Sequence, residues 1–105
     1  MAIPLSNNTK KALEILLDDA IRVRVEKRLV AETSEEIPMW HEFTPKGLER
    51  IRFSVIKLIA ANPKNENIAF NHAKKDWRDL FMAAGFGGSA TEHERWFQTL
   101  KKSNG

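Results

Sequence analysis

The feature that most constrains the fold is the stretch at residues 65–88, NENIAFNHAKKDWRDLFMAAGFGG. Placed on an α-helix, its apolar side chains fall within about 120° of arc, and its charged side chains take the opposite side. The apolar set comprises Ala69, Phe70, Ala73, Trp77, Leu80, Phe81 and Ala84. Gly85 supplies a stop signal, because glycine readily adopts the left-handed conformation that follows a helix, and Phe86 then lies near Phe81. The pattern predicts an amphipathic helix on which the core is assembled.

The composition is that of one globular domain. The chain has 105 residues, of which 42% are hydrophobic and 30% charged, and it includes three Trp and six Phe. It contains no cysteine, which excludes disulfides and thiolate metal sites. No apolar run approaches the roughly 20 residues of a membrane span, and the N-terminus lacks the pattern of a secretory signal. We expect a single helical domain over residues 1–105 that is cytoplasmic and has no membrane partner.

The N-terminal third predicts a helix of ambiguous length. Residues 6–9 offer several N-cap side chains, and the helix then runs through KKALEILLDDA. An i, i+4 apolar series favours one long helix to about residue 31; it consists of Leu13, Leu17, Ile21, Val25 and Leu29. Residues 21–26, IRVRVE, also alternate with period two, so a strand is the competing interpretation. We favour the helix.

Two further helices have clear start signals. Thr44 can cap a helix with Pro45 in its first position, and KGLERIRFSVIKLIAA follows, ending at Asn62-Pro63. Ser89 and Glu92 fit a capping box before a last helix that places Trp96, Phe97 and Leu100 on one side. The prediction is an all-α fold, a compact bundle of about four helices. The alternative is an α+β fold with a small hairpin within residues 21–43.

The sequence offers little for catalysis or metal binding. It has no Gly-x-Ser-x-Gly stretch and no His-Glu-x-x-His, and its histidines are His41, His72 and His93. We expect His72 to pair with Asp76 one turn along the helix, and His93 to be half-buried beside the last aromatic residues. The glycines at residues 85–88 are explained by helix capping rather than by a phosphate loop. The sequence therefore predicts no catalytic residues, no metal, no cofactor and no enzymatic activity.

A basic helix face is the leading candidate for function. On the helix after Pro45, Lys46, Arg50 and Lys57 align within about 40° of arc opposite the apolar face, with Phe53 among them and expected to be exposed. The helix at residues 65–88 adds three cations to the candidate site, Lys74, Lys75 and Arg78. The chain carries a formal charge of +3, which is too small for a protein that coats nucleic acid. Charged faces also keep helical proteins soluble, so a merely solvated face stays open.

The hypothesis for function is a non-catalytic binding or regulatory module that contacts an acidic protein partner through this face. The alternative is a nucleic-acid-binding protein that contacts phosphates with the same face, where Phe53 could stack on a base. Trp40 joins the candidate residues, because an exposed Trp beside Met39 is typical of a binding hot spot. Spare aromatic residues also leave a homodimer open, in which a second copy completes the core.

Overall fold

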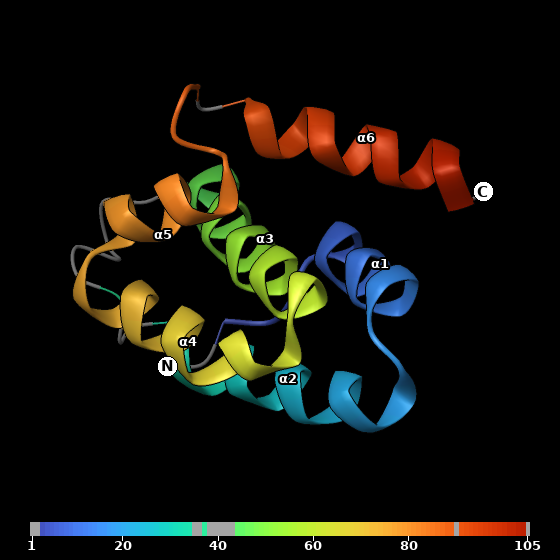
Figure 1. The fold of residues 1–105 in the computed structure, drawn as a ribbon, viewed down its shortest axis with the longest axis horizontal. Coiled ribbons are helices and arrows are strands. Elements are labelled where there is room, and N and C mark those ends of the chain that lie inside the picture. Colours follow the sequence, from blue (N-terminus) through green and yellow to red (C-terminus); the bar gives the residue numbers. More distant parts are fainter. Residues whose placement is uncertain (1–2, 35–36, 38–43, 90, 105) are drawn as a thin grey trace.

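The computed structural model describes residues 3–34, 37, 44–89 and 91–104, and this part of the chain consists of helices and the segments that join them, with no strand (Figure 1). The prediction of an all-α fold is confirmed, with more helices than the expected four, and the hairpin alternative has no support in these residues. The elements are α1 (Asn7–Leu16), α2 (Asp19–Glu32), α3 (Pro45–Ala61), the 3-10 turn η2 (Pro63–Asn65), α4 (Glu66–Lys75), α5 (Trp77–Ala84) and α6 (Glu92–Asn104).

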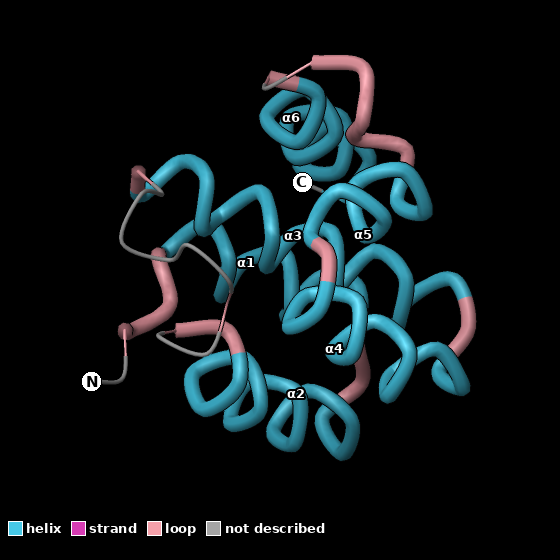
Figure 2. The backbone as a smooth tube through the Cα atoms, turned by 90° about the vertical axis from the view of Figure 1, so that its left-hand side faces the viewer, coloured by secondary structure: helices cyan, strands magenta, loops and turns pink. Residues whose placement is uncertain are grey.

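Helix α3 is the centre of the molecule. It packs against α1, α4, α5 and α6, and both ribbon views place α6 and α2 on opposite sides of it (Figures 1 and 2). An unbroken run of its residues, 51–56, is buried. The core is therefore assembled around α3, and the expectation that residues 65–88 form the central helix is wrong.

Both of the longest predicted helices are broken by a capping aspartate. Asp18 is extended (φ −73°, ψ 166°) and its carboxylate accepts a hydrogen bond from the Ile21 amide at 3.1 Å, so α2 begins afresh after α1. Asp76 is likewise extended (φ −152°, ψ 99°) and accepts from the Arg78 amide at 3.0 Å, which separates α4 from α5. Residues 21–31 are helical, as we favoured, but they do not continue the first helix.

Three other start and stop signals behave as predicted, but the capping box expected at Ser89 and Glu92 is not formed. The Ser89 hydroxyl instead accepts a hydrogen bond from the Thr91 amide at 3.1 Å, and α6 begins at Glu92. The side chains of Ser6 and Thr44 cap α1 and α3, each accepting an amide hydrogen bond at 3.1 Å. Gly85 adopts the left-handed conformation (φ 81°), and the Phe86 amide donates to the Phe81 carbonyl at 2.8 Å. Phe86 is buried as a result. These caps fix where each helix ends, and hence which side chains meet around α3.

Candidate functional site

Phe53 lies in the core, so the expectation that it is exposed is wrong. Its side chain is 0% exposed. Its ring lies edge-on to Trp96 at 5.4 Å between centroids and packs against Phe97 at 5.3 Å, both on α6. The sequence was misread because α6 covers the side of α3 that a two-faced helix would leave to solvent. Phe53 is therefore unable to stack on a base or to anchor a partner.

Arg50 and Lys57 are half-buried and bonded within the chain. The Arg50 guanidinium lies over the Phe81 ring, 4.0 Å from its centroid, and donates to the Phe86 carbonyl. Burial lowers the pKa of Arg50 below its usual value. Lys57 Nζ donates to the Ala84 carbonyl at 2.7 Å. Both cations thus hold the C-terminal end of α5 rather than forming an open surface.

The remaining predicted cations are divided between bonded and exposed positions. Lys46 is 79% exposed at the start of α3, 3.6 Å from the Glu94 carboxylate. Lys75 is exposed on α4, and Arg78 is 76% exposed on α5 beside Asp76. Lys74 instead donates to Glu32 of α2 at 2.7 Å. The structure therefore does not gather the predicted basic residues into one face. Trp40, the remaining candidate, lies outside the described residues.

The bond from Lys74 belongs to a network of charges that joins α2 to α4. Glu32 accepts from Arg28 at 2.6 Å as well as from Lys74, and Glu66 accepts from Arg24 at 2.6 Å and from Arg28 at 2.8 Å. Hydrogen bonds from Arg28 and Lys74 lower the pKa of Glu32 to about 2. Hydrogen bonds from Arg24 and Arg28 lower the pKa of Glu66. These side chains bond to one another and so hold α2 against α4.

A histidine, a carboxylate and a hydroxyl do meet between α1, α3 and α6, but their order is unlike that of a catalytic triad. His93 is 1% exposed, and its Nε2 lies 3.9 Å from Oε1 of Glu49. Ser6 donates to the other carboxylate oxygen of Glu49 at 2.8 Å while it caps α1. In a triad the imidazole stands between the hydroxyl and the acid, whereas here the carboxylate does. The arrangement therefore gives no reason to assign a nucleophile.

The predicted pairing of His72 with Asp76 is not formed. The Asp76 carboxylate caps α5 and faces Arg78, and no ion pair joins it to His72, both residues being among those described. Within the described ranges, no group of three or more His, Asp or Glu side chains is placed to hold a metal ion. None of the helices described is long and apolar enough to cross a membrane.

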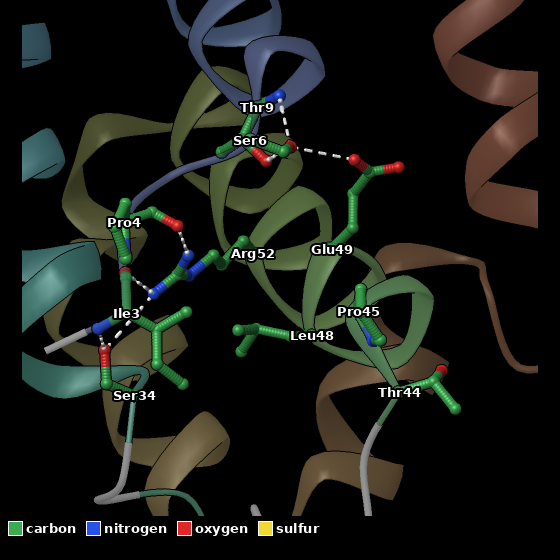
Figure 3. A pocket seen from close by; sticks show the side chains of 10 residues that line it. All are labelled: Ile3, Pro4, Ser6, Thr9, Ser34, Thr44, Pro45, Leu48, Glu49 and Arg52. Atoms are coloured by element: carbon green, nitrogen blue, oxygen red, sulfur yellow. Dashed lines mark hydrogen bonds between the residues drawn. The ribbon is translucent and has the colours of Figure 1, made fainter. Parts of the chain in front are cut away.

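A pocket of about 290 Å³ lies between the lead-in segment, the start of α1 and the first half of α3 (Figure 3). Ten residues line it: Ile3, Pro4, Ser6, Thr9, Ser34, Thr44, Pro45, Leu48, Glu49 and Arg52. Leu48 projects from α3 toward the segment that holds Ile3. Arg52 extends toward Ile3 and Pro4, whereas Glu49 extends away from it toward Ser6 (Figure 3). The lining thus combines four aliphatic residues, four with hydroxyl side chains, one cation and one carboxylate.

Arg52 carries a buried charge to which no carboxylate among the described residues is bonded. The residue is 2% exposed. Its guanidinium donates to the carbonyls of Ile3 at 2.8 Å and Pro4 at 3.0 Å, and to Thr33 and Ser34 of the α2 C-terminus. Every acceptor among the described residues is an uncharged oxygen. Burial alone lowers the pKa of Arg52 to about 10, which leaves it charged at neutral pH.

The sequence signal for this residue is its place in the apolar spacing of the helix. Arg52 follows Leu48 by four positions and precedes Val55 and Ile59 by three and seven, so it lies on the apolar side of the helix. An arginine in such a position must either be satisfied by the fold or bind a ligand. The lead-in segment that supplies its carbonyl partners could not be placed from periodicity.

Comparison with known proteins leaves the chain without an assigned relative. No protein-family model matches it. No curated protein and no solved structure matches it either. The function must therefore be argued from the chain's own residues.

Proposed function

We propose that this protein is a non-catalytic binding module that receives a short segment of an acidic protein partner in the pocket around Arg52. The observation that carries the proposal is the buried cation at the edge of an open pocket, with only uncharged acceptors among the described residues. A charge taken out of water without a counter-ion is costly. An acidic group from a partner would supply that counter-ion, while the aliphatic lining would contact the rest of the segment.

This site differs from the basic face expected from the sequence. Arg50 and Lys57 would have to give up bonds to the end of α5 before they could contact a partner. Lys46, Lys75 and Arg78 remain exposed, and they can attract an acidic partner over a distance, which raises association rates more than affinity. We therefore assign the pocket to recognition and these cations to attraction.

Nucleic-acid binding is the alternative, and the geometry favours it less. Phe53 is buried, and the pocket contains the carboxylate of Glu49, which repels phosphate. A nucleic-acid site would show affinity that falls steeply as salt is raised. A gel-shift titration with single-stranded and duplex oligonucleotides tests this directly, and tight, salt-sensitive binding would replace the protein-partner proposal.

The direct test is affinity selection from a synthetic peptide library, with retained peptides identified by mass spectrometry. The wild-type protein is compared with Leu48→Trp, which places a larger side chain in the pocket, and with Ile68→Trp as a matched control, because Ile68 is exposed on α4 and does not line the pocket. Circular dichroism verifies that each variant is folded. We expect peptides of net negative charge that Leu48→Trp no longer retains and that Ile68→Trp still retains. Peptides kept by Leu48→Trp, or lost equally with Ile68→Trp, would refute the pocket as the site.

A further inference from the structure

The lining of the pocket restricts the charge of its ligand. Arg52 is the only cation among the described lining residues, and Glu49 stands one helical turn before it on α3. Ser6 donates to Glu49, and this hydrogen bond keeps the carboxylate directed away from Arg52 (Figure 3). A ligand with two negative charges would bring its second charge toward Glu49. A single negative charge placed at the Arg52 end avoids that repulsion.

The hydrogen-bonding capacity of Arg52 favours a carboxylate as that charge. A guanidinium has five N–H donors in a planar fork that matches carboxylate geometry. Nη1 carries two of these hydrogens and, among the described residues, donates only to the Pro4 carbonyl at 3.0 Å. The second hydrogen can bond a ligand oxygen without breaking any contact of the fold. A hydrogen bond between two charged groups is about twice as strong as one between neutral groups.

The remaining surface favours a short aliphatic body. Ile3, Pro4, Pro45 and Leu48 supply carbon-rich walls, and none of the described lining residues is aromatic. The cavity, about 290 Å³, is at the lower end of the range for small-ligand sites, which is roughly 300–1,000 Å³. A branched chain of a few carbons fits this size and lining, whereas a flat ring would find no stacking partner here.

We infer that the pocket binds a monocarboxylate with a short branched aliphatic chain, its carboxylate accepting a hydrogen bond from Arg52. The inference deepens the proposed function and rests on the same pocket. The C-terminal carboxylate of a protein that ends in leucine or valine has this chemistry, and so does a free small acid such as 4-methylpentanoate.

The experiment is an NMR titration of the ¹⁵N-labelled wild-type protein with N-acetyl-leucine and with its neutral amide, N-acetyl-leucinamide. The two probes differ only in charge at one end, so no variant that could unfold is needed. We expect saturable shifts of the Arg52 Nε–H signal and of the Leu48 and Ser34 amides with the acid. The amide should bind at least about tenfold more weakly. Equal affinity for acid and amide, or shifts centred elsewhere, would overturn the inference.

Two further arms identify the source of the carboxylate and the role of Glu49. Binding of 4-methylpentanoate as tight as that of N-acetyl-leucine indicates a free acid, and preference for a leucine-terminated pentapeptide indicates a protein C-terminus. In Glu49→Gln, affinity for the dicarboxylate succinate should rise several-fold more than affinity for N-acetyl-leucine, because the second charge lies nearer to residue 49. An unchanged succinate affinity would refute the argument from charge.

The outcomes separate this inference from the proposed function. If library peptides enter the pocket through internal acidic residues while N-acetyl-leucine fails to bind, the binding module stands and the monocarboxylate inference falls. If 4-methylpentanoate binds and no peptide is retained, the monocarboxylate inference stands and the proposal of a protein partner falls.

Discussion

Replacing Glu32 with glutamine tests whether the charge network between α2 and α4 stabilises the fold. Glu32 lies 2.6 Å from Arg28 and 2.7 Å from Lys74, and its side chain is 23% exposed. These partners, Arg28 first, lower its pKa from 4.5 to about 2. Each unit of pKa shift corresponds to about 1.36 kcal/mol, so this shift corresponds to ~3 kcal/mol of folding free energy. Solvent screening of a partly exposed group reduces the expected contribution to about 2 kcal/mol.

The sign of the pH dependence follows from the lowered pKa. Because the folded-state pKa lies below the unfolded one, the contribution of Glu32 is fully present above pH 4.5 and is lost as the pH falls toward 2. Glu66, whose pKa is also lowered, acts in the same direction. Urea unfolding followed by tryptophan fluorescence between about pH 7 and pH 2 measures the free energy of unfolding across this window.

We expect Glu32→Gln to be less stable than wild type by about 2 kcal/mol at neutral pH and to lose less stability on acidification. Glu14→Gln is the matched control, because Glu14 is exposed on α1 and has no ion pair with the described residues. Two results together would refute the reasoning. The first is a loss of unfolding free energy in Glu32→Gln below about 0.5 kcal/mol at neutral pH, which is the size of an ordinary surface ion pair. The second is a loss of stability on acidification as large as that of the wild type.

Three further changes test the packing and the caps by the same unfolding measurement. Phe53→Ala should lower the free energy of unfolding by about 3–5 kcal/mol, because it leaves a cavity at a fully buried site. A change close to zero would contradict the burial of Phe53. Gly85→Ala should cost about 1 kcal/mol, since φ is 81° there, and no loss would contradict the left-handed cap. Asp18→Ala should cost about 1 kcal/mol by removing the cap of α2, and Asp18→Ser should restore most of it; equal losses would argue against capping.

Local signals predicted the helices well, because they depend on neighbouring residues only. Thr44 with Pro45 and Gly85 with Phe86 behave as their types require. The breaks between α1 and α2 and between α4 and α5 also have local signals, since Asp18 and Asp76 are good N-cap residues. They were missed because the apolar spacing continues across both, and periodicity alone cannot distinguish one helix from two that pack on the same core.

Burial was harder to predict than helix position, because it depends on how many neighbours a helix has. A two-faced pattern is expected when a helix packs on one side only. Helix α3 is instead contacted by α1, α4, α5 and α6. Phe53 is covered by α6, and Arg50 lies between α3 and the end of α5. The candidate site could not be predicted for the same reason, since its walls come from segments far apart in the sequence.

Three of the four cations of α3 share a physical role, namely Arg50, Arg52 and Lys57. The last carbonyls of a helix lack partners within it and carry a partial negative charge. Lys57 bonds to Ala84 and Arg50 to Phe86 at the end of α5, and Arg52 bonds to Thr33 at the end of α2. The same chemistry that would attract an acidic partner is used here to hold helix ends against the central helix. Of these three side chains, Arg52 alone also lines the 290 Å³ pocket, so it is the one whose positive charge the proposed ligand would meet while the same guanidinium holds the end of α2.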